Sequence, residues 1–305
     1  MRWKTTWSKW CWTCARPQRA PRRRYRAEPV ARRPVLLPRG RLIAHRGGGA
    51  HAPENTLQAL AGVPMLGTDW AEVDVRLTGC GTPVLLHDPD LDATTSGRGP
   101  LAAVAAADLA GLDAALWFGA GAVAEPPATL ARALALAARI GLGLNLELKP
   151  PAEAGEDAAL GLVTAVARVI EAAPLPPGRL VVTSTSAAVV SLAARLLPTL
   201  PVGPVLRRPA DAATMAGVIT TADLVVMNAR RFGPRAIRAL RSRADPPLVL
   251  VYGTDSRRRL RRLIRAGAAA AIVDAPDRIL GAPLPTPLLP VWLRRLRNRW
   301  RKERG

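Results

Sequence analysis

The sequence is poor in cysteine, because its 305 residues include only Cys11, Cys14 and Cys80. Cys11 and Cys14 form a Cys-x-x-Cys pair, but neither a second pair nor a flanking strand–helix pattern accompanies it, which argues against a zinc site or a redox motif. Cys80 lies between two glycines, where a tight turn is expected. Such sparse usage is typical of proteins in a reducing compartment.

Long apolar runs are also missing. No run reaches the roughly 18 residues that a membrane-spanning helix requires, so we expect no such helix. The N-terminal charges are not followed by an apolar segment, so we expect no secretory signal. Together with the cysteine usage, these features predict a cytoplasmic protein whose basic ends offer a means of peripheral membrane attachment.

Acidic residues are scarce: the sequence has 23 Asp and Glu against 44 Lys and Arg, a net charge of +21. Such a balance is typical of nucleic-acid-binding proteins, but its distribution argues otherwise. Residues 1–40 carry a net charge of +11 and residues 288–305 carry +6, which leaves +4 for residues 41–287. Because the excess belongs to the two ends, nucleic acid is not the partner that we expect.

The two basic ends have different textures. Tryptophan alternates with Lys and Arg at the start of residues 1–40, and Arg and Pro dominate the rest, which predicts a disordered extension. A surface anchor for anionic lipid is the alternative. In residues 288–305, Trp292, Leu296 and Trp300 are four apart and predict a basic amphipathic helix. This helix either packs back on the body or contacts an anionic membrane surface.

The body, residues 41–287, alternates short apolar runs with Ala- and Leu-rich helical stretches, which predicts a parallel sheet covered by helices. The strands are expected at 41–44, 70–75, 83–87, 143–148, 179–184, 202–206, 223–227, 248–252 and 270–273. The helices are expected at 55–62, 129–140, 156–172, 186–196, 210–218, 234–243 and 256–266. At a length of about 245 residues, a closed (β/α)8 TIM-type barrel is the natural arrangement.

Nine expected strands are one more than a barrel of eight needs. The segment between Val75 and Pro83 is too short for a crossover helix, because a parallel connection takes a dozen or more residues. We therefore expect a turn at Gly79-Cys80-Gly81. The barrel should depart from plain βα repetition near its second and third strands.

All three histidines lie between residues 41 and 87, and two of them, His45 and His87, follow apolar runs. Between these runs, Glu72 and Asp74 share one face of an expected strand, because side chains alternate along a strand. Glu147 and Lys149 share a face in the same way. Barrel active sites lie where the strands end, so we expect these groups to converge there.

Acidic strand faces inside a barrel need compensation, because unpaired buried charge is strongly disfavoured. Glu72, Asp74 and Glu147 around a hard cation would provide it, and oxygen ligands suit Mg²⁺ or Ca²⁺. Buried ion pairs, for instance Glu147 with Lys149 or Glu72 with Arg46, would also provide it. The spacing does not decide between the two.

The histidines suit proton transfer. One of His45 and His87 would take a proton from an attacking hydroxyl while the other donates one to a leaving oxygen. Arg46 and Lys149 would neutralise charge on a phosphoryl group. His51 lies in a glycine-rich loop, where a structural role and substrate contact are both open. The run Pro53-Glu54-Asn55-Thr56 predicts a helix start with Asn55 or Thr56 as N-cap.

The order of these motifs resembles that of the glycerophosphodiester phosphodiesterases. The resemblance is dense over residues 42–101, continues at 143–149, thins afterwards and covers neither end. It rests on His45-Arg46-Gly47, Pro53-Glu54-Asn55-Thr56, Glu72-x-Asp74-Val75, His87-Asp88, Leu91 with Thr94-Thr95-x-Gly97-x-Gly99, and Glu147-Leu148-Lys149.

The resemblance implies a TIM-type barrel that hydrolyses glycerophosphodiesters to sn-glycerol 3-phosphate and an alcohol. It implies a divalent cation, Mg²⁺ or Ca²⁺, at Glu72, Asp74 and Glu147. It also implies that His45 and His87 are the acid–base pair and that Arg46 and Lys149 bind the phosphate. Direct attack by water and formation of a cyclic phosphate both remain open.

Three positions depart from the family pattern. Tyr252-Gly253-Thr254-Asp255 stands where the family has an aromatic-Thr-x-Asn run, Ser184-Thr185 replaces a Ser-Phe pair, and Ala93 replaces an arginine. None of them removes a candidate metal or acid–base residue. They affect the pocket expected to select the alcohol portion of the substrate.

Two other functions remain open at this stage. A lysophospholipase D with the same chemistry would use the basic ends to stay at a bilayer. A weakly active barrel would instead act as a basic membrane- or nucleic-acid-binding protein, and its nucleic-acid affinity would fall steeply with salt. Deleting residues 1–40 and 288–305 should abolish such binding and leave diesterase activity intact.

Overall fold

The structure is a computed structural model that describes residues 33, 35, 38, 41–119, 121–151, 155–173 and 175–281. These residues belong to one compact unit of the chain. The expected amphipathic helix at 288–305 and nearly all of the expected extension at 1–40 lie outside the described residues. Arg33 is described, and its guanidinium pairs with Asp223 at 2.9 Å.

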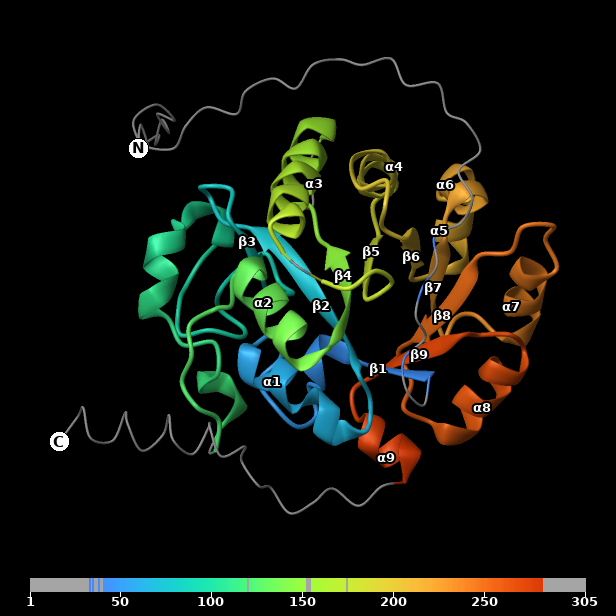
Figure 1. The fold of residues 1–305 in the computed structure, drawn as a ribbon, viewed down its shortest axis with the longest axis horizontal. Coiled ribbons are helices and arrows are strands. Elements are labelled where there is room, and N and C mark those ends of the chain that lie inside the picture. The colour runs from blue at the N-terminus through green and yellow to red at the C-terminus, as the bar shows by residue number, and fades with distance from the viewer. Residues whose placement is uncertain are drawn as a thin grey trace, which may run out of the picture. The chain divides into compact units, whose positions relative to one another are not determined.

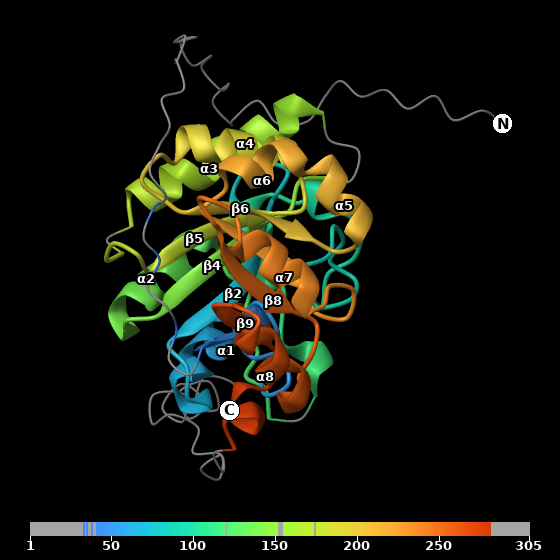
Figure 2. The same ribbon diagram turned by 90° about the vertical axis from the view of Figure 1, so that its right-hand side faces the viewer.

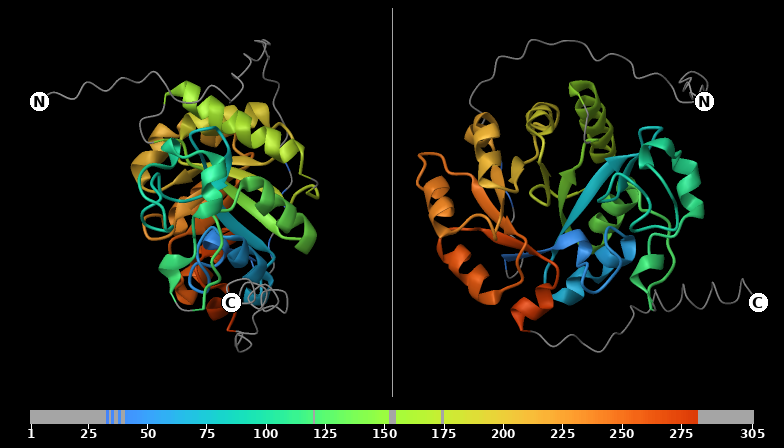
Figure 3. Two further views of the ribbon diagram at one scale, coloured as in Figure 1. Left: turned by 90° about the vertical axis from the view of Figure 1, so that its left-hand side faces the viewer. Right: turned by 180° about the vertical axis from the view of Figure 1, so that it is seen from behind.

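Eight parallel strands close into a barrel (Figure 1; Figure 3, right). Closure depends on the short first strand, which pairs with the last strand through Leu42 and Ala271 and with the second through Ala44 and Ala71. The predicted (β/α)8 barrel is therefore confirmed. Its strands are β1 (Leu42–Ala44), β2 (Trp70–Leu77), β4 (Gly143–Leu148), β5 (Leu180–Ser184), β6 (Val202–Leu206), β7 (Leu224–Asn228), β8 (Leu248–Tyr252) and β9 (Ala270–Val273).

Helices cover the outside of the barrel (Figures 1 and 2). Side-chain hydroxyls cap four of them, each cap contributing about 1 kcal/mol. The α-helices are α1 (Leu57–Gly62), α2 (Leu130–Ile140), α3 (Glu156–Glu171), α4 (Ala187–Leu196), α5 (Pro209–Thr214), α6 (Ala216–Thr221), α7 (Pro234–Arg241), α8 (Arg257–Arg265) and α9 (Pro276–Leu280). Short 3-10 helices span His45–Gly47, Val63–Leu66, Leu101–Ala103, Ala106–Gly111 and Leu116–Phe118.

The helix expected at 210–218 is instead two helices, α5 and α6, which separate at Met215. Met215 has a ψ of 5°, outside the helical range. Methionine is a good helix former, so Met215 itself does not indicate the break, but the neighbouring Thr214 and Gly217 are weak helix formers. None of the described helices is both long and apolar enough to cross a bilayer.

The predicted irregularity near the second and third strands is a β-hairpin. β3 (Pro83–Leu85) runs antiparallel to the end of β2, with Val75 opposite Leu85. The turn between them contains Gly81 at a φ of +81°, and the Gly81 amide donates to the Thr78 carbonyl at 2.9 Å. The returning strand continues to Leu86, whose amide donates to the Asp74 carbonyl at 3.1 Å. The hairpin thus brings the following residue, His87, back to the end of the second barrel strand.

Because side chains alternate along the barrel strands, the apolar residues pack in two regions, one between the strands and the helices and one inside the barrel. Outward-facing residues of β2, such as Val73, pack with the surrounding helices in one large core cluster. Inward-facing Trp70 packs instead with residues of other strands, such as Leu250 and Ile272, and fills the barrel. A β-carbon at Gly143 would lie 2.3 Å from the Trp70 ring, so glycine is needed there. Above this apolar layer the inward positions become polar.

Candidate functional site

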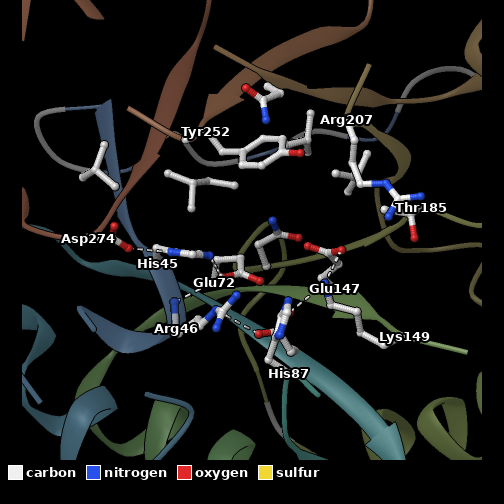
Figure 4. Close-up of a pocket in the computed structure, with 18 of the residues that line it drawn as sticks. His45, Arg46, Glu72, His87, Glu147, Lys149, Thr185, Arg207, Tyr252 and Asp274 are labelled. Atoms are coloured by element: carbon white, nitrogen blue, oxygen red, sulfur yellow. Dashed lines mark hydrogen bonds and ion pairs between the residues drawn. The ribbon is translucent and has the colours of Figure 1, made fainter. Parts of the chain in front are cut away.

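The carboxyl ends of the barrel strands surround a cavity of about 820 Å³. Most of its lining side chains are polar, and many of them are charged (Figure 4). The cavity contains every residue to which the sequence assigned a site role: His45, Arg46, Glu72, Asp74, His87, Glu147 and Lys149. The structure therefore brings all seven together.

Three carboxylates gather on one side of this cavity. Asp74 of β2 is directly opposite Glu147 of β4 in the strand register, and Glu72 lies two residues before Asp74 on the same face. One carboxylate oxygen from each of the three lies within 4.8 Å of the other two. Such a cluster of hard oxygen donors is the chemistry that Mg²⁺ or Ca²⁺ prefers.

Burial and neighbouring charges together determine the pKa values of Glu72 and Asp74. Glu72 and Asp74 are almost completely buried, at 2% and 1% exposure. Burial and the nearby Asp74 charge raise the pKa of Glu72 to about 8. Burial also acts to raise the pKa of Asp74, but the positive charges of Lys149 and Arg46 outweigh it, so that pKa is lowered. The two carboxylates therefore differ in proton affinity because their neighbours differ.

The neighbouring cations satisfy only part of the cluster. Lys149 Nζ lies 2.7 Å from Glu147 and 3.1 Å from Asp74, so the expected pair of Glu147 with Lys149 forms. The expected pair of Glu72 with the Arg46 side chain does not form, because that guanidinium contacts Glu54 at 2.7 Å and Asp74 at 3.4 Å. Within the described part of the chain, Glu72 accepts one hydrogen bond, from the Arg46 backbone amide to Oε2 at 3.1 Å.

The other oxygen of Glu72 is the clearest sign of a missing ligand. Glu72 Oε1 is buried and has no hydrogen-bond partner among the described residues. A buried carboxylate oxygen left without a partner costs about 1–3 kcal/mol or more. A divalent cation at the three carboxylates would satisfy this oxygen, so the donor set fits the ion that the sequence predicts.

His45 follows β1 and faces the carboxylates. Its Nδ1 lies 2.6 Å from Asp274, which fixes the ring, and its Nε2 lies 3.8 Å from Glu72 (Figure 4). Burial lowers the pKa of His45, but the Asp274 hydrogen bond and the Glu72 charge outweigh burial, so the pKa is raised. Because Nδ1 is engaged, Nε2 is the nitrogen available to the cavity.

His87 is held in the same way. Its Nδ1 lies 2.7 Å from Asp88, which leaves Nε2 as the free ring nitrogen. Arg76 donates from Nε to the His87 carbonyl at 2.8 Å and fixes the backbone. Each imidazole thus has one nitrogen on a carboxylate and one available for proton transfer.

The segment from Arg46 to Thr56, after β1, supports the site through its backbone conformation and through the Asn55 side chain. Arg46 and Asn55 have positive φ angles of 51° and 57°, uncommon for residues with a side chain. The Asn55 side chain donates from Nδ2 to Asp74 Oδ2 at 3.0 Å, and its Oδ1 accepts from the Asp74 backbone amide at 3.1 Å. Thr56, not Asn55, is the N-cap of α1, because Asn55 is committed to Asp74.

His51 is separate from this machinery. Its Nε2 lies 2.7 Å from the buried Asp277, and it does not line the cavity. Sequence reasoning left open substrate contact and a structural role, and the geometry indicates the structural one.

Sequence reasoning missed the supporting roles of Asp274, Glu54 and Asn55. Asp274 immediately follows the barrel strand β9, and this position already indicates an active-site residue. Its pairing with His45 links residues 229 apart, which the sequence does not indicate. Glu54 and Asn55 belong to a motif for which a helix start was a sufficient explanation.

Other polar side chains complete the lining of the cavity. Tyr252 and Thr185, two of the positions that depart from the family pattern, line it together with Arg207 (Figure 4). Arg207 forms no ion pair with the cavity carboxylates, in contrast to Arg46. The departures from the family pattern at Thr185 and Tyr252 therefore lie in the lining of the cavity itself.

Comparison with known proteins agrees with this geometry. The model of the glycerophosphoryl diester phosphodiesterase family matches residues 45–278. Rat glycerophosphodiester phosphodiesterase 1 is 48% identical over 79 residues, which are 24% of either chain. A glycerophosphodiester phosphodiesterase of Caldanaerobacter subterraneus is 36% identical over 108 residues, covering 35% of this chain and 44% of that protein. The chain thus aligns with less than half the length of these relatives.

Solved structures match over more of the chain. An Oleispira antarctica phosphodiesterase, solved in complex with its product sn-glycerol-3-phosphate, has a TM-score of 0.70 and 29% identity, and the match covers 79% of this chain and 95% of that one. A Silicibacter pomeroyi protein named as a putative glycerophosphoryl diester phosphodiesterase has a TM-score of 0.70 and 22% identity, covering 84% and 98% of the two chains. The second likeness concerns the fold alone.

Proposed function

The chain belongs to the glycerophosphoryl diester phosphodiesterase family, and from this premise we propose that it hydrolyses glycerophosphodiesters to sn-glycerol 3-phosphate and an alcohol. The observation that carries the proposal is the convergence of His45, His87 and three carboxylates on one cavity. The similar Oleispira enzyme was solved with sn-glycerol-3-phosphate, which is the product we expect here.

In the proposed reaction the two histidines move protons. One imidazole takes the proton of the attacking hydroxyl through Nε2, and the other donates a proton to the oxygen that leaves with the alcohol. Asp274 and Asp88 hold the rings in the required tautomers. The attacking hydroxyl belongs either to water or to the glycerol portion. Attack by water gives the products with this one pair of proton transfers, whereas attack by the glycerol hydroxyl gives a cyclic phosphate that water opens with a second pair.

The cations of the site hold the substrate phosphate. Arg46 and Lys149 would place positive charge beside the phosphoryl oxygens, and their own carboxylate contacts keep them in position. Glu72, Asp74 and Glu147 would hold a divalent cation, Mg²⁺ or Ca²⁺, as the unpartnered Glu72 oxygen supports. Such an ion, when bound, polarises the phosphoryl oxygens as a Lewis acid.

The finer assignments form part of the same proposal. We propose that residues 41–287 are the catalytic domain and that residues 1–40 and 288–305 are accessory. The sparse cysteine usage supports a cytoplasmic location. Contact of the basic ends with an anionic membrane surface rests on their composition, because nearly all of their residues lie outside the described part of the chain.

A coupled assay for released glycerol 3-phosphate tests the activity. Glycerophosphocholine, glycerophosphoethanolamine, glycerophosphoinositol and lysophosphatidylcholine would be compared with divalent ions present. We expect release from at least one glycerophosphodiester, and His45→Ala should lower turnover by at least about 100-fold. His51→Ala is the matched control, because it removes a histidine of the same segment that does not line the cavity.

Two outcomes would contradict the proposal. The first is the absence of glycerol 3-phosphate from every glycerophosphodiester. The second is an equal loss of turnover in His45→Ala and His51→Ala. Release of choline from lysophosphatidylcholine, with lysophosphatidic acid as the other product and no glycerol 3-phosphate from any glycerophosphodiester, would instead identify the lysophospholipase D reaction.

A further inference from the structure

Positive charge is concentrated on one side of the barrel. Residues 228–266 contain 12 Arg and two Asp, a net charge of +10, although residues 41–287 as a whole carry only +4. The remainder of the body is therefore negative by six charges. Helices α7 and α8 are neighbours on this side (Figure 2) and contain no acidic residue. They carry nine of these arginines, all of them exposed: Arg235, Arg238, Arg241, Arg257, Arg258, Arg259, Arg261, Arg262 and Arg265. We call this surface the α7–α8 face.

The arginines at the start of α8 are placed against the stability of their own helix, whereas Arg262 and Arg265 lie in its last turn, where the helix dipole favours positive charge. Arg257, Arg258 and Arg259 form its first turn, where the helix dipole disfavours positive charge. Arg261 and Arg265 are four residues apart on one face, and like charges at this spacing repel. No carboxylate in the described part of the chain forms an ion pair with them. An external anion would relieve this repulsion.

An aliphatic groove adjoins the arginines. It has a volume of about 340 Å³ and lies between α8, α9 and the outer side of β1 and β9. Ile264, Ile279 and Leu280 contribute to its lining, and Leu280 is 38% exposed. Arg257 and Arg261 also line the groove, so positive charge and aliphatic surface occur at one place.

We propose that the α7–α8 face binds the surface of an anionic phospholipid bilayer, with the arginines on the headgroup phosphates and an aliphatic chain in the groove. Guanidinium groups pair well with phosphate oxygens, and each basic residue near an anionic surface adds to the attraction. A nucleic acid would match the charge, but it has no aliphatic segment for the groove. The observations therefore favour lipid.

The position of this face relates it to the cavity. α8 begins at Arg257, five residues after the end of β8, so its first turn lies at the end of the barrel where the cavity opens. Arg230, which follows β7, lines the cavity itself. Bilayer contact through this face would keep the cavity opening near the membrane surface. The inference concerns binding, so it stands independently of the proposed diesterase activity.

Co-sedimentation of the full chain with vesicles tests the proposal. Vesicles of phosphatidylglycerol and phosphatidylcholine in equal parts would be compared with pure phosphatidylcholine vesicles. The test variant replaces Arg258, Arg261, Arg262 and Arg265 with Gln. The control variant makes the same charge change at four exposed arginines of α2, α3 and α4: Arg132, Arg139, Arg168 and Arg195. Both variants keep the basic ends unchanged.

We expect the wild type to bind the anionic vesicles and not the neutral ones. The α8 variant should bind at least about 10-fold more weakly, and the control variant less than about threefold more weakly. Leu280→Asn should weaken vesicle binding at constant charge. Equal losses in the α8 and control variants would overturn the proposal, as would tighter binding of duplex DNA than of vesicles that depends on the α8 arginines.

Thermal unfolding provides a second readout that does not depend on sedimentation. Gln is a good helix former, so the α8 variant should remain folded. Anionic vesicles should raise the unfolding temperature of the wild type and leave that of the α8 variant unchanged. An equal rise in both proteins would place the contact elsewhere on the chain and contradict the proposal.

Discussion

The contact between His45 and Asp274 offers a sharp test of how the cavity prepares its acid–base groups. Asp274→Asn keeps the size of the side chain and removes its charge. The lost interaction is a charge-assisted hydrogen bond of 2.6 Å. Such bonds contribute about 1.5–3 kcal/mol, and the partial exposure of Asp274 (54%) reduces this to about 1–2 kcal/mol. We therefore expect kcat to fall by about 5- to 30-fold.

The same substitution should change the pH dependence in a defined direction. Asp274 and Glu72 raise the pKa of His45 by stabilising its protonated form, against the effect of burial. Removing the Asp274 charge must lower that pKa. If His45 is the base, the acidic limb of the pH–rate profile moves to lower pH; if it is the acid, the alkaline limb does so. The limb that moves identifies the role of His45.

Asp277→Asn is the matched control for this experiment. It makes the same change at another His–carboxylate contact, where His51 lies 2.7 Å from Asp277 away from the cavity. We expect its kcat and pH profile to equal those of the wild type, with the unfolding temperature of both variants measured in parallel. An unchanged kcat and pH profile in Asp274→Asn, or the same loss in Asp277→Asn, would refute the reasoning.

Three further predictions follow from single contacts. If His87 is the general acid, His87→Ala should lose at least about 100-fold in turnover on a substrate with an alkyl leaving group. The loss should be far smaller on a p-nitrophenyl ester of glycerol phosphate, because that leaving group needs no proton, and equal losses on both substrates would exclude this role. Gly143→Ala should lower the free energy of unfolding, measured in urea, by about 1–3 kcal/mol, because the added methyl group clashes with Trp70. The control Gly161→Ala adds a methyl group in open space within α3 and should raise the free energy of unfolding by about 0.4–1 kcal/mol. Hydrogen bonds from Thr78, Thr82 and the Ala106 amide outweigh burial and lower the pKa of the Cys80 thiol to about 7. The rate of Cys80 alkylation, followed by peptide mass spectrometry across a pH series, should therefore reach half of its maximum near pH 7, and a midpoint near 8.5 would contradict this.

The sequence predicts the barrel well because its strands are buried on both faces. A run such as residues 248–252 is apolar almost throughout, so its position is evident without any tertiary information. The hairpin between β2 and β3 was predictable from chain length, because the seven residues between Val75 and Pro83 do not accommodate a crossover helix. The break between α5 and α6 was not predicted, although Thr214 and Gly217 beside Met215 are weak helix formers, because local propensity does not fix where a helix ends.

The candidate site shows the same division. The alternation of Glu72 with Asp74 placed both on one face, and the rule that barrel sites form at strand ends brought His45 and Glu147 to them. The partners of these groups come from tertiary contacts that local spacing does not encode. Arg46 is an example: its guanidinium turns to Glu54 and Asp74, whereas the sequence alternative paired it with Glu72.

The metal requirement tests the central claim most directly. The chain would be stripped of divalent ions, checked for residual metal by mass spectrometry, and assayed for release of glycerol 3-phosphate before and after addition of Mg²⁺ or Ca²⁺. Our account predicts no release before the addition and recovery afterwards, with Glu72→Gln failing to recover. Full turnover by the verified metal-free chain would contradict it.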